Sequence, residues 1–242
     1  MQKISKNQVK YVRSLARKKV RDEEHVFVAE GEKCVSELMK SFELVLRADK
    51  TNATALELEQ MSSLRSPQGV IGVFKRPKKE AVDLQTLASR ELVLMLDGVQ
   101  DPGNVGTIIR TADWFGIRHI FCSPETADCW SPKVVQATMG ALARVQVHYT
   151  APSQPLLVRG GEKYPIYGTL LNGRNIYEEG AVPVKDHGII VMGNEGNGIS
   201  QELRRLITHP LLIPPYPADA ETSESLNVSV ATAVVLAEFR RG

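Results

Sequence analysis

From residue 92 onward, short apolar runs alternate regularly with segments whose apolar residues recur at helical spacing. Alternating strands and helices predict a parallel sheet with helices on both faces, which defines the fold class as α/β. The segment Gly188–Met192 is apolar throughout, as expected of a strand buried on both sides. The expected strands are 92–96, 118–122, 145–149, 165–170, 188–192 and 210–213, and the expected helices are 104–115, 132–142, 200–207 and 226–240.

The first 75 residues predict a smaller α/β domain of their own. A charged segment that contains proline, Lys75–Glu80, follows a short apolar run and is the best candidate for a linker. The domain boundaries expected from this pattern are 1–75, a linker at 76–90, and 91–242; within the first domain, helices are expected at 5–19, 31–40 and 53–62 and strands at 43–47 and 70–74.

Charge is distributed unevenly along the chain. Residues 1–79 carry 17 Lys and Arg against 10 Asp and Glu, although the whole chain has a net charge of only +2. The first 21 residues hold eight basic side chains and no acidic one. Such a concentrated positive segment favours a nucleic-acid backbone as partner, and a solvated helix face is the alternative. The expected RNA contacts are Lys3, Lys6, Lys10, Arg13, Arg17 and Lys18.

Several classes of protein are disfavoured. No apolar run approaches the ~20 residues needed to cross a bilayer, and the N-terminus lacks the apolar stretch of a secretory signal, so no membrane partner is expected. An organelle transit peptide remains an alternative for the basic N-terminus.

The three cysteines (Cys34, Cys122 and Cys129) form no C-x-x-C pair, so we expect a reducing cytoplasm and no metal.

Three loops that follow expected strands carry the candidate chemistry: Asp97–Gly106, Gly193–Gly198 and Ile213–Asn227. In a parallel sheet these loops meet at the carboxyl edge, which is the usual ligand crevice of such folds. The spacing of the glycines matches neither the dinucleotide fingerprint nor the P-loop with its lysine, which disfavours a nucleotide-dependent enzyme.

Individual residues in these loops have two interpretations each. Asn104 is a natural N-cap for the helix after the first loop, and Arg110 points away from the apolar face of that helix. A guanidinium there suits a phosphate or ribose oxygen, although the spacing alone favours an ordinary surface Arg. Glu195 is either a functional acceptor or a carboxylate that holds backbone amides. For Ser225 and Asn227, capping of the last helix is a sufficient explanation.

The last helix has few polar positions. From Val228 to Ala237 only Ser229 and Thr232 are polar, so nearly every face is apolar. A helix of this kind is buried in the core or against another subunit. We predict a contact between protomers.

Taken together, the three loops resemble the motifs of a known family. The segments DGVQDPGNVGTIIRTADWFG, MGNEGNGIS and SLNVSVA resemble motifs one, two and three of the SpoU (TrmH-like) ribose methyltransferases of the SPOUT superfamily, in the same order. The likeness covers about residues 91–242. The segment before it is similar to the small RNA-binding domain of the ribosomal protein L30e fold, through Ser5 with its basic neighbours and the segment Phe27–Gly31.

The resemblance implies a C-terminal trefoil knot, an obligate homodimer and S-adenosylmethionine as cofactor. It implies transfer of a methyl group to a ribose 2′-hydroxyl in ribosomal RNA; the same chemistry on tRNA and a non-catalytic RNA-binding assembly factor are the alternatives. By motif position, Arg110, Asn104, Glu195, Ser225 and Asn227 serve catalysis, and the cofactor is held by Thr169, Leu170, Gly193, Asn194, Ile213, Pro214 and Leu226.

The chain departs from the family pattern in the third loop. Between Ile213 and Ser225 it has the segment PPYPADAETSE, which is several residues longer than usual and has no glycine. The cofactor contacts implied at Ile213 and Pro214 therefore rest on a less direct match than those at Gly193 and Leu226.

Overall fold

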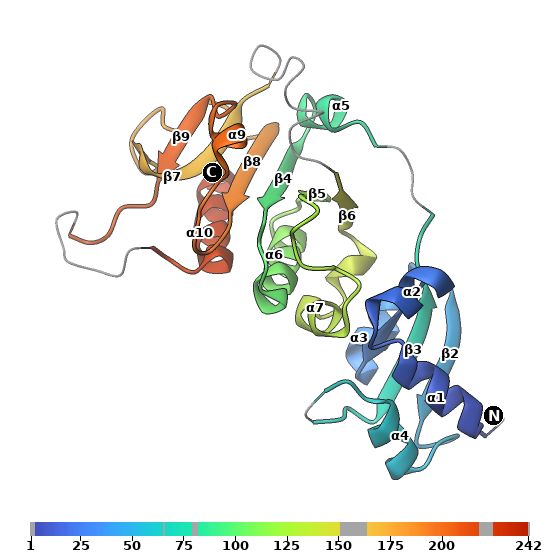
Figure 1. Cartoon of the computed structure of the whole chain (residues 1–242). Helices are drawn as coiled ribbons and strands as arrows, with labels where there is room; N and C mark the ends of the chain where they lie inside the picture. Colours follow the sequence, from blue (N-terminus) through green and yellow to red (C-terminus); the bar gives the residue numbers. More distant parts are fainter. Residues whose placement is uncertain (1–2, 65, 79–81, 151–163, 218–224, 242) are drawn as a thin grey trace. The chain divides into compact units, whose positions relative to one another are not determined.

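The computed structural model describes residues 3–64, 66–78, 82–150, 164–217 and 225–241 (Figure 1). The chain forms two compact units. The first unit comprises Met1–Glu80 together with Asp128–Arg144, and the second comprises Ala81–Ala127 together with Val145–Gly242. Within the described ranges, no helix is long and apolar enough to cross a membrane.

The second unit is built on a parallel sheet of six strands in the order β6-β5-β4-β8-β7-β9. This confirms the predicted α/β fold class. Every strand expected after residue 91 is present within a few residues of its predicted bounds, except that one is longer. The strands are β4 (Leu92–Asp97), β5 (His119–Cys122), β6 (Gln146–Tyr149), β7 (Ile166–Asn175), β8 (Gly188–Gly193) and β9 (His209–Leu212).

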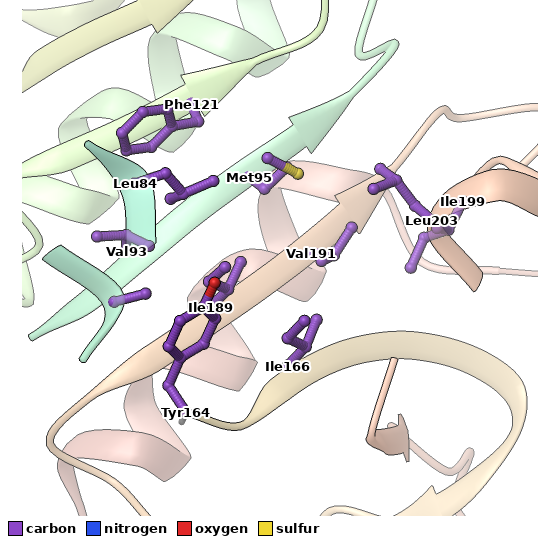
Figure 2. Close-up of a cluster of buried hydrophobic side chains, with 11 residues drawn as sticks. Leu84, Val93, Met95, Phe121, Tyr164, Ile166, Ile189, Val191, Ile199 and Leu203 are labelled. Atoms are coloured by element: carbon purple, nitrogen blue, oxygen red, sulfur yellow. The ribbon is translucent and has the colours of Figure 1, made fainter. Parts of the chain in front are cut away.

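Helices cover both faces of this sheet. On one face, α5 (Leu84–Ala88) and α9 (Gln201–Arg204) bury their apolar residues against the inward side chains of β4, β7 and β8 (Figure 2). On the other face, α10 (Val228–Arg240) packs against β8 and against α6 (Pro102–Trp114). The ring of Phe239 in α10 meets the ring of Tyr167 in β7 edge to face, with centroids 4.8 Å apart. Burial of these apolar side chains is the main force that holds the sheet and helices together.

Strand β7 is longer than its apolar pattern predicts. It pairs with β9 at two places, because both Thr169 and Arg174 lie opposite Leu211. Between Thr169 and Arg174 the regular pairing of β7 with β9 is interrupted, and it resumes at Arg174. Gly173 permits the pairing to resume, since a Cβ there would lie 2.4 Å from the backbone carbon of Leu211.

The first unit contains an antiparallel sheet of order β1-β3-β2 and several short helices. The helix expected at 5–19 is two helices, because the chain leaves helical geometry between Leu15 and Arg17. Strand β1 was not predicted as a strand, since its five residues are all buried and show no alternation. The elements before residue 80 are α1 (Lys6–Ser14), α2 (Lys18–Glu24), β1 (Val26–Glu30), α3 (Glu32–Leu38), β2 (Leu44–Asp49), α4 (Ala55–Met61) and β3 (Val70–Lys75).

A segment from the middle of the sequence completes the first unit. It holds α7 (Pro132–Thr138) and a short 3-10 helix (Ala141–Ala143). The ring of Trp130 lies 4.9 Å from that of Phe27 and 6.1 Å from that of Phe42. Asp128 accepts a 2.7 Å bond from the buried guanidinium of Arg21, which also donates to the carbonyl of Leu15. No local pattern predicts this arrangement, because the segment has ordinary helical spacing.

The segment expected as a linker, 76–90, includes helix α5. Asp83 caps this helix through its carboxylate, and Leu84 and Ala88 are buried in the core of the second unit. The three cysteines are buried, and none of them forms a disulfide in the part of the chain that the structure describes. Burial raises the pKa of the Cys34 thiol to about 11, so this thiol is unreactive at neutral pH.

Candidate active site

Loops at the carboxyl edge of the second unit's sheet converge, as predicted. Loop 98–101 follows β4, loop 194–200 follows β8, and loop 213–217 follows β9. Backbone N–H groups of loop 98–101 and the side chains of Asn104 in α6 (Pro102–Trp114), Glu195 and Asn227 form one hydrogen-bonded network. Residues far apart in the sequence are thus fixed beside one another at the edge where parallel sheets bind ligands.

Asn104 lies at the centre of this network. Its Nδ2 donates to Oε1 of Glu195 at 3.0 Å, and its Oδ1 accepts from Nδ2 of Asn227 at 3.0 Å. The prediction that Asn104 caps the helix was wrong. Asp101 is the cap, since its carboxylate accepts from the backbone N–H of Asn104 at 2.9 Å and Pro102 occupies the first helical position. The amide of Asn104 is therefore available to join the loops.

Glu195 holds backbone amides, which is one of the two roles that the sequence left open for it. Besides the bond from Asn104, its carboxylate faces the backbone N–H groups of Gln100 and Asp101, each at 3.4 Å. These contacts identify it as an acceptor that ties the second loop to the first. It also lines the cavity described below, so one of its sides is open to a ligand.

Asn227 serves two structural purposes. Its Oδ1 accepts from the backbone N–H groups of Ser229 and Val230 and so caps α10, as the capping interpretation predicts. Its Nδ2 bonds to Asn104 at the same time. The cap of the last helix is thereby locked to the start of α6.

The glycine-rich loop after β8 is held by Asn194. Its Nδ2 donates to the carbonyl of Gly98 at 2.6 Å, and its Oδ1 accepts from the N–H groups of Gly196 and Asn197. A Cβ on Gly193 would lie 2.3 Å from the carbonyl carbon of Gly198, so only glycine permits this closure. Both ends of the Asn194 amide are hydrogen-bonded to the backbone of these loops. Asn194 therefore lines the cavity, but its side chain serves to hold the loop.

These loops surround a cavity of about 910 Å³. All seven residues expected to hold a cofactor line it, and so do Glu195 and Ser225. Its walls are largely apolar, and the glycine-rich loop contributes backbone groups to them. Lining residues that the sequence did not predict are Leu171, Asn172, Met192, Gly196, Asn197, Gly198, Ile199, Arg204, Leu211, Leu212, Pro215, Tyr216, Val228 and Ala231.

The sequence held a local signal for only one of these residues that we can name, Tyr216. Leu171 and Asn172 continue β7 beyond its apolar run, and their exposure follows from the long β7–β9 crossing, which no local pattern reveals. Tyr216 lies in the segment that is longer than the family pattern, and its side chain is 98% exposed at the cavity. A single aromatic residue among prolines was the available signal.

Arg110 is placed differently from the other predicted catalytic residues. It is exposed on α6, six residues beyond Asn104, which is about 9 Å along a helix. It is absent from the lining that the described residues provide to the cavity. One turn further along the same helix, Trp114 is 85% exposed. The sequence correctly placed Arg110 away from the core, and within one chain it faces solvent.

The basic side chains of α1 share one face. Val9, Val12 and Leu15 are buried, whereas Lys6, Lys10 and Arg13 are exposed at helical spacing opposite them. Lys3 and Arg17 are exposed as well, and Lys18 pairs with Asp22. Among the eight basic residues near the N-terminus, Arg21 alone is buried, and its role is structural.

Comparison with known proteins identifies the family. Residues 91–237 match the model of the SpoU rRNA Methylase family. The chain belongs to this family. Residues 6–72 match the model of an MRM3-like substrate binding domain. The resemblance inferred from the three motifs is thereby confirmed.

The chain has relatives that match it over nearly its whole length. It is 32% identical to the 23S rRNA (guanosine(2553)-2′-O)-methyltransferase of Bacillus subtilis, over 98% of this chain and 97% of the relative. A structure of an RNA methyltransferase of the TrmH family from Porphyromonas gingivalis is 39% identical, with a TM-score of 0.84 over 98% of both chains. An AdoMet-bound rRNA methyltransferase from Sinorhizobium meliloti is 27% identical, with a TM-score of 0.84 over 99% of this chain and 96% of that one.

Proposed function

We propose that this protein transfers the methyl group of S-adenosylmethionine to a ribose 2′-hydroxyl in ribosomal RNA. The observation that carries the proposal is the cavity, which gathers all seven residues expected to hold the cofactor beside the network of Asn104, Glu195 and Asn227. Membership of the SpoU family supports the same reaction, and the names of full-length relatives support ribosomal RNA as the substrate.

The cavity has the chemistry that this cofactor requires. Leu170, Leu211 and Leu226 offer apolar surface to an adenine ring, and the backbone of the glycine-rich loop offers donors and acceptors to its edge and to the ribose. Glu195 places a carboxylate at a cavity that must accept a positively charged sulfur. When bound, S-adenosylmethionine supplies a methyl group on that sulfur, which leaves as a neutral thioether.

The residues of this chain position and polarise the RNA. The planar guanidinium of Arg110 presents several N–H groups, so we assign Arg110 the role of a hydrogen-bond donor. Its planar N–H groups suit both the ribose 2′-oxygen and the adjacent phosphate, which lowers the cost of losing the hydroxyl proton to that phosphate or to water. The network around Asn104 fixes the loops against which the ribose is placed, so little ordering is required when RNA binds.

We propose a homodimer in which Arg110 of one protomer serves the cavity of the other. On the paired helices α6 and α10, Trp114 is 85% and Val230 is 50% exposed, and Ala237 on the apolar last helix is exposed as well. An exposed apolar surface of this kind favours a second copy of the chain as its cover. Its burial would also enclose Arg110, which lies one turn from Trp114 on the same helix.

We further propose that the C-terminal segment forms a trefoil knot and that the first unit has an L30e-like RNA-binding fold. Membership of the SpoU family supports the former. The exposed cations of α1 support RNA binding by the first unit.

The decisive test is methylation of RNA by the purified protein. With labelled S-adenosylmethionine and ribosomal RNA from cells that lack the protein, we expect one 2′-O-methylated nucleoside to form, identified by mass spectrometry after nuclease digestion. The same RNA with a 2′-deoxy nucleotide at that position serves as control and should accept no methyl group. If only tRNA is methylated, tRNA and not ribosomal RNA is the substrate. If the protein binds the cofactor but methylates no RNA, a non-catalytic RNA-binding assembly factor is favoured.

A further inference from the structure

One cationic side chain at the cavity has no part in the network described above. Arg204 lies at the end of α9 and lines the cavity, although the three motifs do not include it. Among the lining residues that the structure describes, it is the only cation, and Glu195 is the only acid. A cation at the wall of a largely apolar cavity is a candidate for recognition of a charged ligand.

The structure holds the guanidinium of Arg204 in one orientation. Its Nε donates to the carbonyl of Ile199 at 2.7 Å. Its Nη2 lies over Gly198, where a Cβ would be only 3.1 Å away. Gly198 has a φ of +66°, so glycine suits this position for its backbone and for the space that it leaves to Arg204.

Among the residues that the structure describes, none neutralises the charge of Arg204 at the cavity. Glu195 directs its carboxylate to Gln100, Asp101 and Asn104, and no described acidic side chain forms an ion pair with Arg204. With Nε used by Ile199, the two terminal nitrogens are left for a partner. Two parallel N–H donors match the paired oxygens of a carboxylate or a phosphate.

We propose that Arg204 binds an anionic group of a ligand in this cavity and is a positioning residue for methyl transfer. The group has two oxygens and a negative charge, and the proposed reaction offers two sources: the carboxylate of the cofactor's amino-acid arm and a phosphate of the RNA beside the target ribose. The inference rests on the proposed function, because it needs these two ligands.

The experiment compares Arg204→Ala with Arg205→Ala. Arg205 is the next residue, is exposed, and does not belong to the described lining of the cavity, so its variant matches the change in charge and chain position. Binding is measured by calorimetry for S-adenosylhomocysteine, which has the carboxylate, and for 5′-methylthioadenosine, which lacks it. The KM for RNA is measured at saturating cofactor, and Arg204→Lys tests for partial rescue.

Two results support the proposal and identify the source. A loss of about tenfold to hundredfold in affinity for S-adenosylhomocysteine, with affinity for 5′-methylthioadenosine unchanged, assigns the carboxylate. Unchanged binding of both nucleosides with a KM for RNA raised about tenfold or more assigns the phosphate.

Two other results would overturn it. If Arg204→Ala weakens both nucleosides equally, its effect comes from disturbance of the loop through Ile199. If it behaves like Arg205→Ala in all three measurements, Arg204 binds no anion there. Methylation by the wild-type protein and by Arg205→Ala tests the proposed function separately, so failure of one is distinguishable from failure of the other.

Discussion

The exposed cations of the first unit point into solvent, whereas the polar side chains of the second unit's loops are bonded to one another. Lys6, Lys10 and Arg13 lie along one helix and need only helical spacing to share a face. Asn104 precedes Glu195 by 91 residues and Asn227 by 123, and the three meet only because a parallel sheet brings its loops to one edge. The first arrangement suits attraction of a long polyanion, and the second suits accurate placement of one small group.

The largest effect is expected at Arg110, the residue that we propose acts on the target ribose. We predict that Arg110→Ala lowers the rate of methyl transfer by roughly 10²–10³, as loss of a charged donor at a developing negative oxygen does. Affinity for the cofactor should not change, because Arg110 lies outside the cavity lining that the structure describes. Single-turnover kinetics and calorimetry measure the two quantities. Arg118→Ala, an exposed residue of the same unit, is the control. Turnover near that of the wild type would remove Arg110 from the mechanism.

A second variant tests whether the segment Asp128–Arg144 belongs to the first unit. Trp130 is half-buried and contacts Phe27 and Phe42, so Trp130→Ala should lower the free energy of unfolding by about 2–3 kcal/mol, less than for a fully buried aromatic residue. Hydrogen exchange should rise in β1 and remain unchanged in β8. Trp130→Phe should lose less than half as much. Equal loosening of β1 and β8 would contradict the division into units.

A third test concerns the exposed cations. Replacement of Lys6, Lys10 and Arg13 by Gln should weaken RNA binding about tenfold and reduce the slope of log affinity against log salt by about 2. Binding of the cofactor should be unaffected. The control replaces Lys33, Lys40 and Lys50, which are exposed in the same unit and change the net charge equally. If both triple variants lose the same affinity, net charge and not the face of α1 attracts the RNA.

The smallest effect is a dependence of stability on pH in the second unit. Burial and the neighbouring His119 lower the pKa of His148 to about 4 from an ordinary value of 6.5. The folded state therefore favours the neutral ring, and stability that is complete above pH 6.5 declines as the pH falls toward 4. We expect a loss of about 1–2 kcal/mol, because partial exposure screens part of the shift. Urea denaturation at pH 7 and pH 4.5 measures it, and His148→Gln should flatten the dependence. An equal loss in that variant would assign the effect to other groups.

The architecture of the second unit was largely predictable from local patterns. Each strand of its parallel sheet has an apolar run of its own, and periodicity alone placed all six. The convergence of three loops also followed, since the carboxyl ends of parallel strands share an edge. The motifs then named residues of the cavity that periodicity could not separate from ordinary loop residues.

Most of the errors depend on contacts between distant residues, and the cap of α6 is a local exception. Asn104 is a good capping residue by type, but Asp101 followed by Pro102 competes better for the helix start. The extension of β7 depends on a second pairing with β9, and the role of Arg21 depends on Asp128, 107 residues later. Arg204 was missed because the role that we propose for it depends on its place at the cavity and not on its neighbours in the sequence.

The insertion of Asp128–Arg144 into the first unit has a consequence for engineering. A chimaera that replaces residues 1–75 with the RNA-recognition module of another enzyme would leave Trp130 without the rings of Phe27 and Phe42, and Asp128 without the guanidinium of Arg21. A transplant that exchanges both stretches together would carry these partners with it. Retargeting of this enzyme to a new RNA therefore requires two splice sites flanking Asp128–Arg144 in addition to the one near residue 80.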